Sequence, residues 1–208
     1  MRKYSVLVAV VFLLLGFTTT SQANFIVNGD FDSPLSVGWI TSGDVDRENT
    51  LGNPMNGYYA VLGSDTSSGT SSLSQSFAIP VGVDELAVSF SYTFAGSDTA
   101  PFQADTALAA LKQSFWFFSS KSELLEASSP GDYASGTYYG VVSVANWLGI
   151  DATTGELIFR LHESSPLIGS TNSLFAVDNV SVAAVPEPTT MVLLGLGLVG
   201  FAAARRRK

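Results

Sequence analysis

Apolar and polar residues alternate in short runs through the middle of the chain, between residues 58 and 182. A period of two residues is typical of β-strands with one buried face, and clusters of Gly, Ser, Asp, Asn and Pro separate the runs. Residues 104–112 instead have helical composition and predict a short helix within a connection. Strands of this number and spacing favour an all-β, two-sheet sandwich. Seven strands are predicted: Tyr58–Leu62, Leu73–Ile79, Leu86–Phe94, Ser114–Phe118, Tyr138–Val144, Leu157–His162 and Phe175–Val182.

The N-terminus has the three parts of a secretory signal peptide. Two basic residues, Arg2 and Lys3, precede an apolar run of twelve residues, Val6–Phe17. A small-x-small pattern, Ser21-Gln22-Ala23, follows. We therefore expect residues 1–23 to direct export and signal peptidase to cleave after Ala23. The alternative is an uncleaved signal anchor, although twelve apolar residues are short for a membrane span.

The C-terminus, residues 186–208, also has three parts in order. The motif Val185-Pro186-Glu187-Pro188 joins it to the preceding segment, and its prolines favour an extended chain. Residues 190–204 carry no charge and can just cross a thin bilayer as a single transmembrane helix. The basic tail 205–208 (Arg205, Arg206, Arg207 and Lys208) would hold that end in the cytoplasm. These features predict transient membrane anchoring, with the residues before 186 outside.

This order of features resembles the PEP-CTERM sorting signal, and Val185-Pro186-Glu187-Pro188 and the Arg cluster carry the resemblance. The resemblance implies a membrane exosortase that recognises the tail in a Gram-negative bacterium that makes exopolysaccharide. It also implies an inner-membrane-anchored precursor that later reaches the cell surface or the extracellular matrix of a biofilm.

The segment between the two targeting signals, residues 24–185, is one strongly acidic domain. It holds four basic residues and seventeen acidic residues, a net charge of −13 with His162 neutral. Such a surface repels nucleic acid and anionic lipid, so we expect no nucleic-acid partner. The whole chain contains no cysteine, which excludes disulfides, zinc–thiolate sites and thiol nucleophiles.

No catalytic motif stands out in this domain, and we expect no enzymatic activity. His162 is the single histidine, and no Gly-x-Ser-x-Gly elbow supports a serine nucleophile. A glycoside hydrolase needs only two suitably spaced carboxylates, and seventeen acids leave that alternative open.

Both ends of the domain resemble galactose-binding-like jelly-roll modules, a group that includes many carbohydrate-binding modules. The resemblance rests on Phe25–Asp32 with Gly38-Trp39 at the start, and on Phe175–Val182 at the end. It implies a jelly-roll-like sandwich whose first and last strands are neighbours, with a structural Ca²⁺ beside them. The side-chain ligands that it implies are Asp32 and Asp178. The alternative is that both are turn acids that bind no metal.

Aromatic side chains could provide platforms for sugar rings. Trp39 and Trp116 are expected to lie in the core, whereas Tyr133, in a Gly-Asp-Tyr-Ala-Ser-Gly loop, is the best candidate for an exposed ligand-binding ring. We therefore expect a structural or adhesive surface protein associated with exopolysaccharide. The alternative function is a dedicated carbohydrate-binding module, and a hydrolase with an unrecognised carboxylate pair comes third.

Overall fold

The computed structural model describes most of residues 24–185. The described residues are 23–52, 54–55, 57–63, 69–96, 104–114, 119–129, 133–144, 152–164 and 173–185, together with Gly195, Gly197 and Arg205. The predicted signal peptide and transmembrane segment otherwise lie outside these ranges. In the part of the chain that the structure describes, no helix is long and apolar enough to span a membrane.

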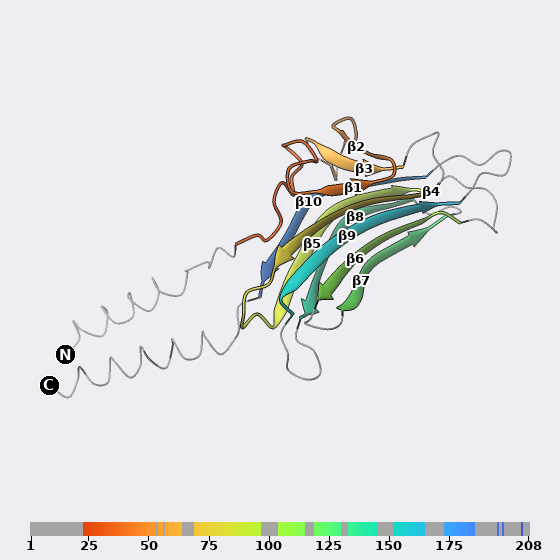
Figure 1. The fold of residues 1–208 in the computed structure, drawn as a ribbon. Coiled ribbons are helices and arrows are strands. Elements are labelled where there is room, and N and C mark those ends of the chain that lie inside the picture. The colour runs from red at the N-terminus through yellow and green to blue at the C-terminus, as the bar shows by residue number, and fades with distance from the viewer. Residues whose placement is uncertain are drawn as a thin grey trace, which may run out of the picture.

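Two five-stranded antiparallel sheets stack face to face (Figure 1). Their strands follow the orders β1-β4-β9-β6-β7 and β2-β3-β10-β5-β8. The all-β, two-sheet sandwich predicted from the sequence is therefore confirmed. The strands are β1 (Ile40–Ser42), β2 (Val45–Glu48), β3 (Tyr59–Leu62), β4 (Gly69–Ala78), β5 (Glu85–Ala95), β6 (Thr106–Ser114), β7 (Ser119–Ser128), β8 (Tyr133–Ser143), β9 (Thr154–Glu163) and β10 (Leu174–Ala184).

Six of the predicted strands correspond to β3, β4, β5, β8, β9 and β10. The seventh, Ser114–Phe118, is different: Ser114 ends β6, and residues 115–118, including Trp116, lie outside the described residues. The predicted helix at residues 104–112 is wrong, because this segment forms most of β6 between β9 and β7. Its alternate residues Ala107, Ala109 and Leu111 are fully buried, so pairing on both sides overrides the helical preference of alanine and leucine.

The core fills the space between the sheets. Phe159 of β9 lies at its centre, in contact with aromatic rings from the opposite sheet and with Trp39. Trp39 is 5% exposed, which confirms that it belongs to the core. The buried core residues all lie between Ile26 and Val182, so residues 24–185 contain the complete described core and are expected to fold on their own.

The first segment of the domain lies against its last strand, as the jelly-roll resemblance implied. Asn24 forms an isolated antiparallel bridge with Ala183. The backbone N–H of Phe25 donates to the Val182 carbonyl oxygen at 2.7 Å, and the Val180 N–H donates to the Gly29 carbonyl oxygen at 2.8 Å. The N-terminal segment therefore closes the sandwich without forming a full strand.

Candidate functional site

Tyr133 lies at the first position of β8, the edge strand of its sheet. It pairs with Ala95 of β5, so the prediction that Tyr133 sits in a loop is wrong. The pairing between β5 and β8 continues as far as Tyr133, so the segment that was expected to be a Gly- and Ser-rich loop forms the start of β8. Tyr133 is nevertheless 72% exposed, as predicted.

A row of uncharged side chains extends from Tyr133 along the outer face of β8. Every second residue of the strand is exposed, and Tyr139 is as open as Tyr133, at 73%. The remaining members of the row are Ser135, Thr137, Val141 and Ser143. Six residues separate the two tyrosines, which places their rings about 20 Å apart along the strand. Tyr139 was not predicted as a ligand-binding residue, although the two-residue period of a strand places it on the same face as Tyr133.

The neighbouring strand leaves space beside both rings. In the ladder, Ala95 lies opposite Tyr133 and Ser89 opposite Tyr139, so small side chains flank each tyrosine on β5. The hydroxyls of Thr93 and Ser135 are 3.2 Å apart and form a hydrogen bond across the two strands. Strands β5 and β8 together carry one charged residue, Glu85, which lies opposite Ser143 at one end. The surface thus combines two aromatic platforms with hydroxyl groups and little charge. We refer to the exposed row of β8 as the tyrosine face; it consists of Tyr133, Ser135, Thr137, Tyr139, Val141 and Ser143.

The inner side of β8 fixes the tyrosine face in position. Tyr138 stacks on Phe90, with ring centroids 4.9 Å apart and an interplanar angle of 16°. Gly140 leaves room for this ring, because a Cβ at Gly140 would clash with the Tyr138 hydroxyl group. A surface held on a packed strand is better ordered than the same residues on a loop.

A second candidate is a shallow groove of about 280 Å³ on the outer face of the other sheet. Its walls come from four strands, and its lining includes no Phe, Tyr or Trp. The predicted strand-end residue His162 is exposed there, with its Nδ1 3.1 Å from the Thr70 hydroxyl oxygen. The carboxylates of Glu123 and Glu126 also line the groove. The groove therefore offers a carboxylate pair of the kind that the hydrolase alternative requires. The lining residues are Thr70, Thr106, Leu108, Glu123, Glu126, Arg160 and His162.

The two predicted calcium ligands have different surroundings. Asp178, on β10, is 1% exposed, and its carboxylate accepts hydrogen bonds from the Asn179 backbone N–H at 2.6 Å and from Asn179 Nδ2 at 3.0 Å. Asp32 is exposed in the segment that precedes β1. The backbone carbonyl oxygens of Phe31 and Asp32 accept hydrogen bonds from Arg47 at 2.5 and 2.7 Å.

The described residues include no group of three or more His, Cys, Asp or Glu that could hold a metal ion. Asp178 still fits a calcium ion by ligand type, because Ca²⁺ binds carboxylate, carbonyl and water oxygens. A cation at Asp178 would therefore have to take backbone carbonyl groups and water for most of its ligands.

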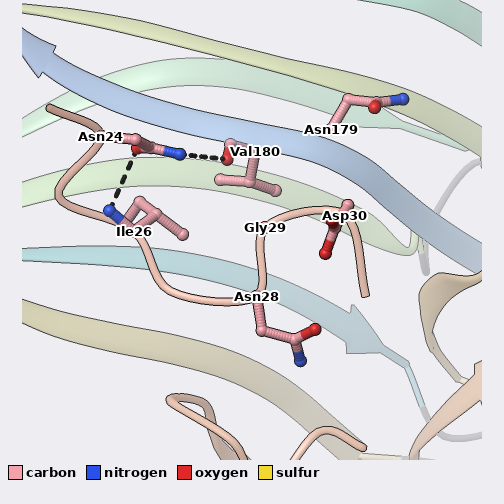
Figure 2. A pocket seen from close by; sticks show the side chains of 7 residues that line it. All are labelled: Asn24, Ile26, Asn28, Gly29, Asp30, Asn179 and Val180. Carbon is pink, nitrogen blue, oxygen red and sulfur yellow. Dashed lines mark hydrogen bonds between the residues drawn. The ribbon is translucent and has the colours of Figure 1, made fainter. Parts of the chain in front are cut away.

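A polar hollow of about 340 Å³ lies where the first segment meets β10, and Figure 2 shows its lining. Its amides are used by the protein itself. Asn24 Oδ1 accepts from the N–H groups of Ile26 and Val182, and Asn28 Nδ2 donates to the Ser33 and Pro34 carbonyl oxygens. The amides of Asn24 and Asn28 therefore hold the first segment in place against β10 and are not free to bind a ligand. The hollow is lined by Asn24, Ile26, Asn28, Gly29, Asp30, Asn179 and Val180.

The sorting residues lie mostly outside the described residues, namely Pro186, Glu187, Pro188, Arg206 and Arg207. Val185 is described: its N–H donates to the Glu85 carbonyl oxygen at 2.9 Å, directly after β10. At the other end, Ala23 is exposed beside the Asn24 bridge. The described sandwich therefore fills the interval between the two predicted processing sites.

Residues 184–208 match the model of the PEP-CTERM protein-sorting motif. The chain carries a PEP-CTERM signal. This motif marks an exported cell-surface protein that is sorted by exosortase, as the sequence resemblance implied. No curated protein matches the chain.

Solved structures with a similar fold include the enzymatically active domain of bacteriophage CBA120 tailspike protein 4, at 16% identity and a TM-score of 0.50. That match covers 78% of this chain and 21% of the tailspike chain. TmCBM61 in complex with β-1,4-galactotriose is similar at 17% identity and a TM-score of 0.48, covering 78% of this chain and 99% of that chain. The CBM22-1 xylan-binding domain of Paenibacillus barcinonensis Xyn10C has 12% identity, a TM-score of 0.47 and coverages of 81% and 99%. At these identities the similarity is one of fold.

Proposed function

We propose that the exported domain is a non-catalytic module that associates with exopolysaccharide through the tyrosine face, as a structural or adhesive component of the cell surface or matrix. The observation that carries this proposal is the exposed, uncharged row on β8 with Tyr133 and Tyr139. Tyrosine rings stack on the apolar faces of pyranose sugars, and serine and threonine hydroxyls bond to sugar hydroxyls.

The negative charge of the domain favours neutral glycans over anionic ones. With a net charge of −13 over residues 24–185, the domain repels anionic polymers at long range. The tyrosine face carries no cation that would offset this repulsion. The proposed ligand is therefore a neutral stretch of polysaccharide, long enough to reach both rings. A dedicated carbohydrate-binding module is the alternative role for the same face, and it would bind one glycan selectively.

Removing both rings tests the proposal. We expect Tyr133→Ala with Tyr139→Ala to weaken binding to neutral polysaccharide by about 30-fold, because each ring contributes about 1 kcal/mol through stacking. Isothermal titration calorimetry on residues 24–185 measures the effect. The matched control, Tyr133→Phe with Tyr139→Phe, keeps both rings and should retain most of the affinity. Equal binding by the alanine and phenylalanine variants would exclude the tyrosine face as the site.

The groove with Glu123 and Glu126 supports hydrolysis as a second candidate function. A carboxylate pair is the minimum that glycoside hydrolysis requires. Incubating the domain with the same polysaccharides and measuring new reducing ends separates the two functions. Turnover that is lost in Glu123→Gln or Glu126→Gln would replace the non-catalytic proposal.

We also propose that a structural Ca²⁺ binds at Asp178, with Asp32 as its second candidate ligand. Ca²⁺ at about 100 times its Kd would add about 2.7 kcal/mol of stability, which corresponds to a rise in Tm of about 5–10 °C for a domain of this size. We expect EDTA to lower the Tm by this amount and Asp178→Asn to remove the effect. The control Asp30→Asn, in the neighbouring hollow, should keep it. A Tm that EDTA leaves unchanged would exclude the metal.

A further inference from the structure

The four edge strands of the sandwich differ in how well they are protected from pairing with another chain. Edge strands expose unpaired backbone N–H and C=O groups, and proteins usually blunt them with short length, charge or proline. Strand β1 has 3 residues, and β2 has 4 residues, of which three are charged. Strand β7 is longer, with 10 residues, and carries Lys121, Glu123 and Glu126.

Strand β8 has none of these protections. It is 11 residues long, about 37 Å, and contains neither a charged residue nor a proline. Within the described residues it pairs with one strand, β5, so no strand covers its other edge. A side chain reaches this strand only at its end, where Gln113 Nε2 donates to the Ser143 carbonyl oxygen at 3.0 Å. Its inward-facing Tyr138 remains half-buried, as expected at an open edge.

We propose that β8 pairs with β8 of a second copy of this chain, antiparallel and about a two-fold axis. Two copies that each carry −13 repel each other across most of their surfaces. An edge strand without charge is the place where their backbones can approach without bringing like charges together. Identical strands are self-complementary in an antiparallel pair, so the contact closes as a dimer.

The geometry of this dimer follows from the strand. A pairing that uses Ala134–Val142, and leaves the Gln113–Ser143 hydrogen bond in place, is centred on Tyr138, so residue 135 of one copy lies opposite residue 141 of the other. The two β8-containing sheets join into one continuous sheet, and both tyrosine faces lie on the same side. If the tyrosine face binds glycan as proposed, the dimer is bivalent and gains avidity on a long polymer. Dimerisation itself does not depend on that function.

Single-cysteine cross-linking tests the arrangement directly, since the chain has no cysteine of its own. In the centred pair, Thr137→Cys brings the two Cβ atoms within about 7–8 Å, whereas Ser143→Cys holds them about 34 Å apart. We expect a short bis-maleimide to cross-link the first variant of residues 24–185 strongly and the second at background level. Equal cross-linking at both positions, or none at Thr137→Cys, would overturn the proposal.

A charge test addresses the same contact without cysteine. Ser135→Glu with Val141→Glu places like charges opposite each other across the two-fold axis while keeping both tyrosines. Analytical ultracentrifugation should show a dimer for the unmodified domain and a monomer for this variant, with the circular dichroism spectrum of the folded sandwich unchanged and the Tm lowered only by the loss of dimerisation. The control, Ser72→Glu with Ala78→Glu, adds the same charge at the same spacing on β4 and should remain dimeric. A monomeric unmodified domain, or a variant that stays dimeric, would contradict the proposal. Monomers that bind an unrelated strand peptide along β8 would point to another partner and would likewise overturn it.

Discussion

Replacing Phe159 with alanine is expected to lower the free energy of unfolding by about 3–5 kcal/mol. Phe159 is fully buried, and its ring centroid lies 5.1 Å from that of Phe90 and 6.2 Å from that of Phe175. Because Phe159 belongs to one sheet and these partners to the other, its removal opens a cavity at the centre of the interface. Urea unfolding of residues 24–185, followed by fluorescence, measures the change.

The neighbouring residue provides the control. Ile158 lies on the same strand and is half-buried on the outer face of the sheet, so Ile158→Ala should cost only about 1 kcal/mol. A small loss for Phe159→Ala, equal to that of Ile158→Ala, would mean that the two sheets do not pack through this ring. The packing of Phe159 against Phe90 and Phe175 at the centre of the core would then be wrong.

Replacing Pro186 and Pro188 with alanine is expected to abolish sorting almost completely. Proline disfavours helix at and before its own position, so the sequence predicts an extended approach to the uncharged segment 190–204. Without them, the helix predicted for residues 190–204 would be free to extend towards the domain, and we expect this to withdraw the recognition residues from exosortase. In a Gram-negative host that has exosortase, we expect the membrane-bound precursor to accumulate and the mature surface form to disappear. Immunoblots of membrane and surface fractions measure this.

The adjacent threonine supplies a matched control for the sorting experiment. Thr189→Ala changes a residue beside the motif without touching the prolines, Glu187 or the arginine cluster. We expect it to mature at the normal rate. Normal maturation of the proline variant would show that the match at residues 184–208 does not act as a sorting signal here.

Local sequence patterns predicted much of the sheet structure because most strands alternate buried and exposed residues. They failed where tertiary pairing decided the structure. Residues of β6 have helical composition, yet β9 and β7 pair with both edges of the segment. Strand β7 was not predicted, since as a charged edge strand it buries only one residue, Ala127.

The candidate site was predictable in part. Tyr133 was recognisable as an exposed ring, but its place in a row required the ladder between β5 and β8. The groove brings Arg160 and His162 of β9 together with Glu123 of β7, and no local sequence pattern predicts that these two strands share a face. Asp178 was found through a resemblance at the end of the domain. Its burial at 1% depends on the strand that carries it and on the contacts around that strand.

The most direct test of the central claim is a titration of residues 24–185 with the host's own exopolysaccharide and with matched neutral and acidic polysaccharides. The account predicts saturable binding to a neutral polymer, weaker binding to acidic ones, and loss of binding in the Tyr133→Ala, Tyr139→Ala variant. Absence of binding to every glycan at high protein concentration would contradict it. The chain would then be a sorted surface protein whose partner is another protein or itself.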